Sequence, residues 1–178
     1  MNRSKYLAWI DLEMTGLDSN RDVILEIAAI VTDNNLKIIA HGPDLIIHQP
    51  QSCLGQMLPM VQALHATSGL VKQVLDSTIS LQQAEAQVLA FFSQYGEPGT
   101  MPLCGNSIWQ DKLFLINYMP KLVNFFHYRI IDVSTVKELV ARWYGAQEFK
   151  KAKKHRALSD IEESVAELKF YRENYFIR

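Results

Sequence analysis

Residues 6–18 read YLAWIDLEMTGLD, an apolar run that two acids interrupt. Its continuous apolar start predicts a strand that is buried on both faces. Asp11 and Glu13 are two residues apart, and such residues share one face of a strand. We therefore expect the two carboxylates to project side by side, with Trp9 and Leu7 further back on the same face.

Two ionised carboxylates that lie close together in a partly dry site repel each other, and one of them would normally stay protonated. A divalent cation that binds both removes this conflict, and oxygen ligands suit hard ions such as Mg²⁺ or Mn²⁺. An isolated D-x-E sequence also occurs where a strand simply emerges into solvent. Further acids are needed to decide between a metal site and a solvated strand end.

The rest of the chain predicts an α/β domain with a mixed sheet. Asn34 and Asn35 separate two apolar strand patterns, and Asn tolerates the positive φ of a tight turn. Ser80 is a good N-cap for the helix that stops before Gly96. The expected strands are residues 6–14, 23–33, 36–49 and 100–105. Helices are expected within residues 54–75, 81–95 and 108–119, with an interruption at Pro120. Two more helices are expected, one after residues 129–135 and one along the apolar stripe from Ile161 to Tyr175.

Length and composition indicate one globular domain, residues 1–178, because 48% of the residues are hydrophobic and 21% are charged. No apolar run reaches the roughly 18 residues of a membrane span, and the first residues lack a signal-peptide pattern. With only Cys53 and Cys104, a disulfide framework is not expected. These features predict a soluble, cytoplasmic protein without membrane contact.

The net charge of −1 is unlike that of a protein that tracks long nucleic acid. It leaves three possibilities: no nucleic acid, contact with only a few phosphates, or help from metal ions.

Two later acids strengthen the metal hypothesis. Asp111 comes directly after a strand-like segment, at a helix start where a capping Asp is also common. Asp160 lies in the first turns of the last helix, where an acid also compensates the helix dipole. His155 precedes Asp160 by five residues, so that a loop can turn its ring toward the same point.

The order D-x-E, a distant Asp, and H-x4-D resembles the DEDD superfamily of 3′→5′ exonucleases, in the branch with the H-x4-D spacing. The blocks IDLEMTGLD, EIAAIVTD, CGNSIWQD, HYRIIDVSTVKELVARW and HRALSDI are similar to the oligoribonuclease family over nearly the whole chain. This resemblance implies a ribonuclease H-like fold, with a mixed central β-sheet flanked by α-helices. It also implies a 3′→5′ exoribonuclease that hydrolyses very short RNAs, especially 5′-phosphorylated dinucleotides, to 5′-mononucleotides.

The same resemblance assigns the catalytic residues. Two divalent ions, Mg²⁺ or Mn²⁺, would be held by the carboxylates of Asp11, Glu13, Asp111 and Asp160. His155 would accept a proton from the attacking water, a role that suits an unperturbed pKa of about 6.5.

The resemblance also implies a set of substrate-binding residues. Leu17 would wedge against a base, Gly16 would let the backbone approach the terminal nucleotide, and His65 would contact a nucleotide. Taken alone, Leu17 is an ordinary loop leucine and His65 an ordinary helix-end histidine. The family commonly has a Trp where this chain has Met60, and a methionine packs on a base without an aromatic face.

Four residues would form a cap around the 5′ phosphate of a short substrate, namely Ser107, Arg129, Ser134 and Thr135. Arg supplies a forked cationic donor, and hydroxyls at a helix start add to its positive dipole. The plainer interpretation is two N-caps and a surface arginine.

Tyr128 would reach the substrate of a neighbouring subunit, which implies a homodimer. The aromatic content of LVNFFHYRII, with Phe125 and Phe126, also favours an exposed interface there.

Two further features bear on the substrate. The basic run KKAKKHR, residues 150–156, is either a solvated loop or an attractant for phosphates. A trimming or proofreading exonuclease for longer RNA or DNA is the alternative enzyme, and a non-catalytic RNA-binding module is the alternative of a different class. The near-neutral charge and the predicted phosphate cap disfavour the first, and the five catalytic-type residues disfavour the second.

Overall fold

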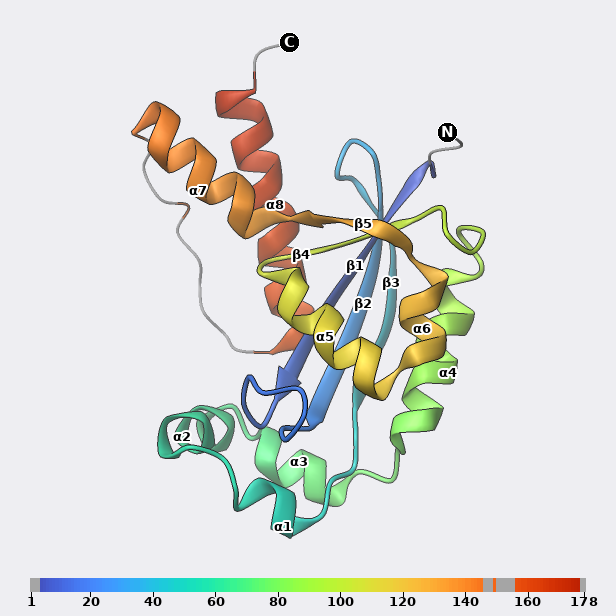
Figure 1. Cartoon of the computed structure of the whole chain (residues 1–178), viewed down its shortest axis with the longest axis vertical. Helices are drawn as coiled ribbons and strands as arrows, with labels where there is room; N and C mark the ends of the chain where they lie inside the picture. The colour runs from blue at the N-terminus through green and yellow to red at the C-terminus, as the bar shows by residue number, and fades with distance from the viewer. Residues whose placement is uncertain (1–3, 146–148, 150–155, 177–178) are drawn as a thin grey trace.

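The computed structural model describes residues 4–145, 149 and 156–176. A five-stranded sheet in the order β3-β2-β1-β4-β5 runs through the centre of the molecule (Figure 1). β2 pairs antiparallel with β1 and β3, whereas β4 pairs parallel with β1 and β5. The predicted mixed sheet is therefore confirmed. The strands are β1 Tyr6–Met14, β2 Ile24–Asp33, β3 Ile38–Ile46, β4 Pro102–Gly105 and β5 His127–Asp132.

The helices begin and end close to the predicted signals. Ser80 caps α4 and forms a complete capping box with Gln83, as its position before an apolar periodic run predicts. Pro120 starts a new helix after α5 ends, so the predicted interruption is confirmed. The helices are α1 Gln51–Leu54, α2 Pro59–Thr67, α3 Leu70–Asp76, α4 Leu81–Phe92, α5 Ile108–Tyr118, α6 Pro120–Phe125, α7 Val133–Tyr144 and α8 Ala157–Tyr175.

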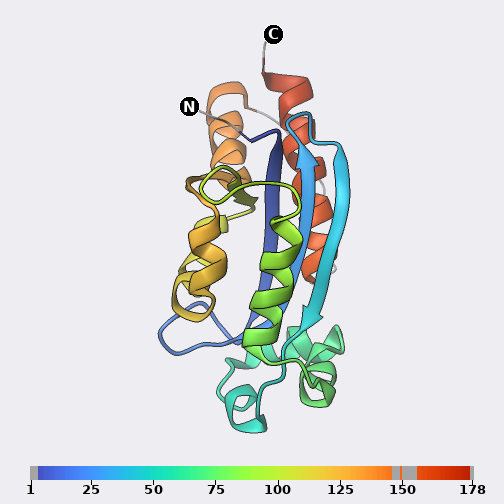
Figure 2. The same cartoon turned by 90° about the vertical axis from the view of Figure 1, so that its right-hand side faces the viewer.

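The helices cover both faces of the sheet, and the alternation along β1 decides which side chains meet which layer. Ala8, Ile10 and Leu12 pack in the cluster that includes residues of α4, α5 and α6. Leu7 and Trp9 pack in the cluster that includes residues of α7 and α8. Figure 2 shows α4 and α8 on opposite sides of the sheet. Asp11 and Glu13, in phase with Trp9, therefore belong to the α8 face.

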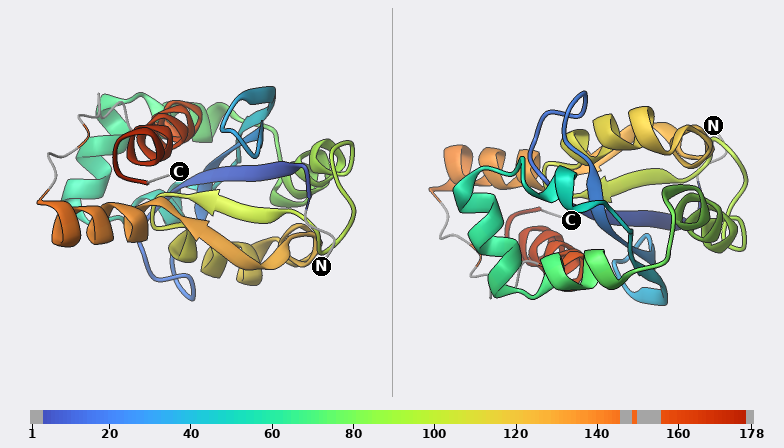
Figure 3. Two further views of the ribbon diagram at one scale, coloured as in Figure 1. Left: turned by 90° about the horizontal axis from the view of Figure 1, so that it is seen from above. Right: turned by 90° about the horizontal axis from the view of Figure 1, so that it is seen from below.

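The three short helices α1, α2 and α3 gather beyond the end of the sheet at which β1 finishes (Figures 1 and 3). Their own apolar cluster includes Leu54, Leu70 and Val74, together with Leu25 of β2. They extend the molecule past the carboxyl end of β1, where the acidic pair lies.

Two segments differ from the sequence-based expectation. Residues 127–132 form the edge strand β5, which the mixed polar and apolar sequence HYRIID did not reveal. Helix α7 begins at Val133, inside the segment that was expected to precede it, because the Asp132 carboxylate accepts a 2.9 Å hydrogen bond from the Ser134 amide.

The interface expectation for LVNFFHYRII is corrected for its two phenylalanines. Phe125 and Phe126 are buried in the cluster of α4, α5 and α6, where Phe126 packs edge-on against Phe92. Both rings belong to the hydrophobic core, and of Phe125, Phe126 and Tyr128 it is Tyr128 that is exposed.

Cys53 and Cys104 are both free thiols. Among the helices of the described residues, none is both long enough and apolar enough to cross a membrane.

Candidate active site

Three of the four predicted metal ligands meet at the end of β1. Asp11 and Glu13 project from β1, and Asp160 reaches them from the first turn of α8. One carboxylate oxygen from each of the three lies within 4.8 Å of the other two. This set of hard oxygen donors fits a divalent ion such as Mg²⁺ or Mn²⁺.

The electrostatics of this acidic group favour the binding of a cation. Burial, followed by the charges of Asp160, Glu26 and Asp111, raises the pKa of Glu13 to about 8. Burial and the neighbouring carboxylates also raise the pKa of Asp11 well above its usual value. The charged forms of these carboxylates repel each other, and a bound cation would offset that repulsion.

Asp111 adjoins this group from the first turn of α5 but is not one of the three. Its Oδ1 accepts a 3.0 Å hydrogen bond from the backbone amide of Leu12, between Asp11 and Glu13. Burial raises the pKa of Asp111 to about 7, although the hydrogen bond from Leu12 opposes the shift. Its charge is the second largest cause, after burial, of the raised pKa of Asp11.

A buried ion pair, which the sequence patterns did not predict, lies beside the acids. Glu26 of β2 is directly opposite Glu13 of β1 and is fully buried. The Arg156 guanidinium binds it through Nε at 3.1 and 3.2 Å and through Nη2 at 2.9 Å. Asp44 of β3 lies close to this pair, and burial together with Glu26 raises the pKa of Asp44 to about 6.

A signal for this pair exists in the sequence. Glu26 is the single charged residue in the interior of an otherwise apolar strand, and a buried charge needs a partner. Arg156, the last residue of the basic run 150–156, serves as that partner. His155 and the lysines of this run lie outside the described residues, so the role of His155 and the attraction of phosphates stay predictions.

The loop from Thr15 to Asp22 presents Leu17 to solvent, with 72% of that residue exposed. The buried Asp22 carboxylate accepts hydrogen bonds from the Thr15 hydroxyl and the Asp18 amide, which closes the loop on itself. A Cβ at Gly16 would lie 2.4 Å from Oδ2 of the buried Asp22, so this position requires glycine because of a contact that the sequence does not reveal. The predicted approach of the Gly16 backbone to a nucleotide stays a prediction.

Helix α5 holds this loop from outside. Gln110 donates a 2.7 Å hydrogen bond to the Leu17 carbonyl, and Asn117 donates to the Ser19 carbonyl. The helix that carries Asp111 therefore also fixes the exposed leucine.

Helix α2 contributes the next two predicted residues. Met60 is 80% exposed on its first turn, with its side chain available to a ligand. His65 is buried, its Nε2 lies 2.9 Å from the Met14 carbonyl, and its Nδ1 lies 3.8 Å from Glu13 Oε2. The ring therefore lies beside a predicted metal ligand, and contact with a nucleotide stays a prediction for both residues.

The two serines of the predicted phosphate cap meet at the N-termini of α5 and α7. Their Oγ atoms are 3.1 Å apart. Ser107 has the left-handed φ of 49°, which is uncommon for a residue other than glycine. Its amide donates to Asp132 Oδ1 and to Ser134 Oγ, both at 3.0 Å, and these two acceptors hold the unusual backbone in place.

The other two cap residues lie nearby on the chain. Arg129 is exposed on β5, and its guanidinium carbon lies 5.1 Å from the centre of the Tyr128 ring. Thr135 is exposed on the first turn of α7. Tyr128 is 71% exposed and stacks on His127.

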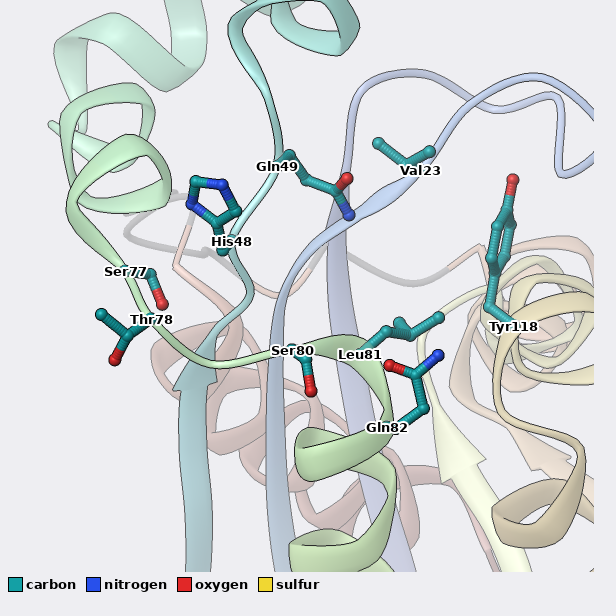
Figure 4. A pocket seen from close by; sticks show the side chains of 9 residues that line it. All are labelled: Val23, His48, Gln49, Ser77, Thr78, Ser80, Leu81, Gln82 and Tyr118. Carbon is teal, nitrogen blue, oxygen red and sulfur yellow. The ribbon is translucent and has the colours of Figure 1, made fainter.

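A separate pocket of about 590 Å³ lies between the end of β3, the start of α4 and the end of α5. Figure 4 shows that Val23, His48, Gln49 and Tyr118 are among the side chains that surround it. The Gln49 side-chain amide donates a hydrogen bond to the Ile24 carbonyl, and the Tyr118 hydroxyl donates one to the Asp22 carbonyl. Of the predicted site residues that the structure describes, none lines this pocket, so we do not regard it as the active site.

Comparisons with known proteins agree with the geometry. A family model described as "Exonuclease" (RNase_T) matches residues 8–168. The chain is 51% identical to "Oligoribonuclease" of Dichelobacter nodosus over 99% of this chain and 98% of that protein. It is 54% identical to "Oligoribonuclease, mitochondrial" of Homo sapiens over 96% of this chain and 73% of that protein.

Solved structures support the fold. An exonuclease I from Methylocaldum szegediense superimposes with a TM-score of 0.72 at 17% identity, covering 96% of this chain and 41% of that one. The Escherichia coli exonuclease I in complex with a 5cy-dT13 oligonucleotide gives a TM-score of 0.70 at 16% identity, covering 97% of this chain and 42% of that one. The chain thus spans about two fifths of these longer proteins, and the likeness confirms the expected ribonuclease H-like fold. Together, the family model and the curated relatives show that the chain belongs to the oligoribonuclease family of exonucleases.

Proposed function

We propose that this exonuclease degrades very short RNAs from the 3′ end and prefers 5′-phosphorylated dinucleotides, which it hydrolyses to 5′-mononucleotides with two divalent ions. The observation that carries this proposal is the acidic group of Asp11, Glu13 and Asp160, with oxygens within 4.8 Å of one another. The high sequence identity to proteins named oligoribonuclease supports the choice of short RNA.

Asp11, Glu13 and Asp160, together with the adjoining Asp111, would hold the two ions. When bound, such a pair of ions acidifies a water molecule and stabilises the negative charge on the leaving 3′ oxygen. The raised pKa values of Asp11, Glu13 and Asp111 support this assignment, because bound cations would offset the repulsion between the carboxylates. Mg²⁺ and Mn²⁺ both suit an all-oxygen ligand set.

His155 would accept the proton of the attacking water. It directly precedes Arg156, whose guanidinium is bound to the buried Glu26, and Asp160 lies one helical turn after Arg156. An unperturbed histidine pKa of about 6.5 suits proton transfer near neutral pH.

The length preference rests on the short distance between the predicted cap and the acids. Ser107 is at the N-cap position of α5 and Asp111 lies four residues later, which corresponds to an axial rise of about 6 Å. A phosphate bound by Ser107, Ser134, Thr135 and Arg129 would thus lie close to the scissile phosphate. A longer RNA would have to give up the cap or pass beside it.

The opposite end of the substrate would rest on apolar side chains. The exposed Leu17 would wedge against the 3′ base, supported by the loop that Asp22 closes and by the approach of the Gly16 backbone. Met60 on α2 would pack against the same nucleotide, and His65 would line that side next to Glu13.

We propose a homodimer in which Tyr128 contacts the substrate of the neighbouring subunit. The exposed Tyr128 ring supports this, and so does the apolar groove between α7 and α8, in which Trp143, Tyr144 and Phe176 are exposed.

The whole chain, residues 1–178, would act as one exonuclease domain, and the family model spans most of it. A cytoplasmic location remains part of the proposal, although the human relative is named mitochondrial.

Digestion of 3′-labelled and 5′-labelled RNAs of graded length tests the proposal. With Mg²⁺ or Mn²⁺, 5′-mononucleotides should be released from the 3′ end, and a chelator should stop the reaction. RNA binding without any release of nucleotides in either metal would favour the non-catalytic alternative. Efficient trimming of long RNA or DNA, with slow turnover of dinucleotides, would favour the alternative enzyme.

A further inference from the structure

We propose that Asn106 is a positioning residue for recognition of the substrate's 5′ phosphate, an inference that rests on the proposed cap of Ser107 and Ser134. Asn106 lies between β4 and α5, directly before Ser107. Its Oδ1 accepts a 3.1 Å hydrogen bond from the Ser134 hydroxyl. Its Nδ2 donates to Ser164 Oγ at 2.8 Å and to Glu167 Oε2 at 3.0 Å.

The surroundings fix which way the Asn106 amide points. Glu167 is fully buried, and a carboxylate oxygen accepts hydrogen bonds, so the amide nitrogen must face it. Ser164 is buried as well, and its hydroxyl donates to the Asp160 carbonyl, which leaves its lone pairs for the Asn106 amide. The amide oxygen of Asn106 is therefore held toward Ser134.

This orientation sets the direction of the hydrogen bonds in the cap. The single hydroxyl hydrogen of Ser134 is donated to Asn106, so Ser134 Oγ accepts from the Ser107 amide and hydroxyl. The Ser107 hydroxyl is then the donor that can rotate toward an arriving phosphate. Ser134 contributes to the cap by accepting from Ser107 and keeping it in its left-handed backbone, and not by donating its own hydroxyl to the phosphate. Asn106 thus sets the orientation of the hydrogen-bond donors around the phosphate without contacting the phosphate itself.

The Asn106 side-chain amide also links the cap, through hydrogen bonds, to the helix that carries Asp160. Through Ser164, Asn106 is connected to the carbonyl of Asp160, and through Glu167 to the interior face of α8. The spacing between the cap and the helix that carries Asp160 is therefore held by buried polar contacts, which suits an enzyme that selects one substrate length.

Asn106→Ala tests the inference by comparing dinucleotides with a 5′ phosphate and a 5′ hydroxyl. The ratio of their kcat/KM values should fall about 3- to 10-fold from the wild-type ratio, the size of one neutral hydrogen bond. The loss should appear as a higher KM for the 5′-phosphorylated substrate. An equal loss on both substrates would make Asn106 merely structural and would overturn the inference.

Two further variants keep the test decisive. Tyr171→Phe removes a different hydrogen bond to Glu167, at 2.9 Å, and should leave the ratio unchanged. Asn106→Asp combined with Glu167→Gln retains an oxygen acceptor for Ser134 without opposing two carboxylates. It loses the donor to Ser164 and places a negative charge nearer the phosphate, so it should restore part of the ratio even if Asn106→Ala folds poorly. A ratio that the double variant loses completely would contradict the inference. A wild-type enzyme that does not distinguish the two dinucleotides would instead refute the proposed cap itself, and the inference with it.

Discussion

The backbone amide of Leu12 donates a 3.0 Å hydrogen bond to Oδ1 of Asp111. Among the described residues, β4 pairs with β1 at Ala8 and Trp9, and the Leu12 amide lies beyond this pairing on the same side of β1. Asp111, from the first turn of α5, supplies the acceptor for this amide. The same carboxylate thus continues the hydrogen bonding of β1 beyond its pairing with β4 and adds a negative charge beside Asp11 and Glu13.

These two roles of Asp111 can be separated by mutation. Asp111→Asn keeps an oxygen acceptor for Leu12 and should retain the stability of the metal-free protein, whereas Asp111→Ala should lower the free energy of unfolding by about 1–3 kcal/mol. Both variants should lose almost all exonuclease activity because a metal-binding charge is gone. Urea denaturation and single-turnover assays measure the two effects. An active Asp111→Asn enzyme would remove Asp111 from the proposed ligands.

Much of this arrangement was predictable, because β1 and β2 follow from apolar runs and the N-cap Ser80 marks α4. The convergence of Asp11, Glu13 and Asp160 follows from strand alternation together with the family resemblance. Other features depend on tertiary contacts that no local pattern records. β5 is an edge strand of mixed polarity, Gly16 is required by the distant Asp22 carboxylate, and Arg156 looked like part of a solvated basic run.

The metal-free protein should become less stable as pH rises from about 5 to about 8. The folded-state pKa of Glu13 is about 8 and that of Asp111 about 7, whereas unfolded carboxyl groups titrate near 4. At pH values between the unfolded and folded pKa values, the folded state binds more protons than the unfolded state. The contribution of Glu13 and Asp111 to the free energy of unfolding is therefore fully present below the unfolded pKa and is lost as pH rises through the folded pKa.

Thermal melting with chelator across this pH range measures that loss. Saturating Mg²⁺ should raise the melting temperature most at the alkaline end, because metal binding competes with fewer protons there. Glu13→Gln should flatten the chelator profile. A wild-type melting temperature that rises steadily with pH in chelator would contradict the assigned electrostatics.

Removing one partner of the buried pair of Arg156 and Glu26 should strongly destabilise the folded protein. Arg156→Ala leaves the fully buried Glu26 charge without its guanidinium and should cost about 3–5 kcal/mol of unfolding free energy. Adding Glu26→Gln should recover part of that loss. Arg142→Ala is the matched control, because its pair with Glu138 is exposed and should be worth less than about 1 kcal/mol. Similar losses for Arg156→Ala and Arg142→Ala in denaturant would refute this account of the pair.

The proposed homodimer should have twice the 20.4 kDa mass of the chain by light scattering. Trp143→Glu, which places a charge in the apolar groove between α7 and α8, should shift the mass toward the monomer if that groove lies in the interface. Tyr128→Ala should raise KM for the dinucleotide while the dimer persists. A monomeric mass for the wild-type chain at all working concentrations would exclude the subunit-crossing role of Tyr128.

The preference for substrate length is tested most directly by kcat/KM on 5′-phosphorylated RNAs from a dinucleotide to about ten nucleotides, each measured over a range of salt concentrations. We predict the highest kcat/KM for the dinucleotide and a shallow dependence on salt, because only a few phosphates are bound by a chain of net charge −1. Arg129→Ala should erase the preference for the dinucleotide more than it slows cleavage. Equal kcat/KM for the dinucleotide and the longest RNA, with a steep loss in salt, would contradict the proposed function and favour a trimming exonuclease.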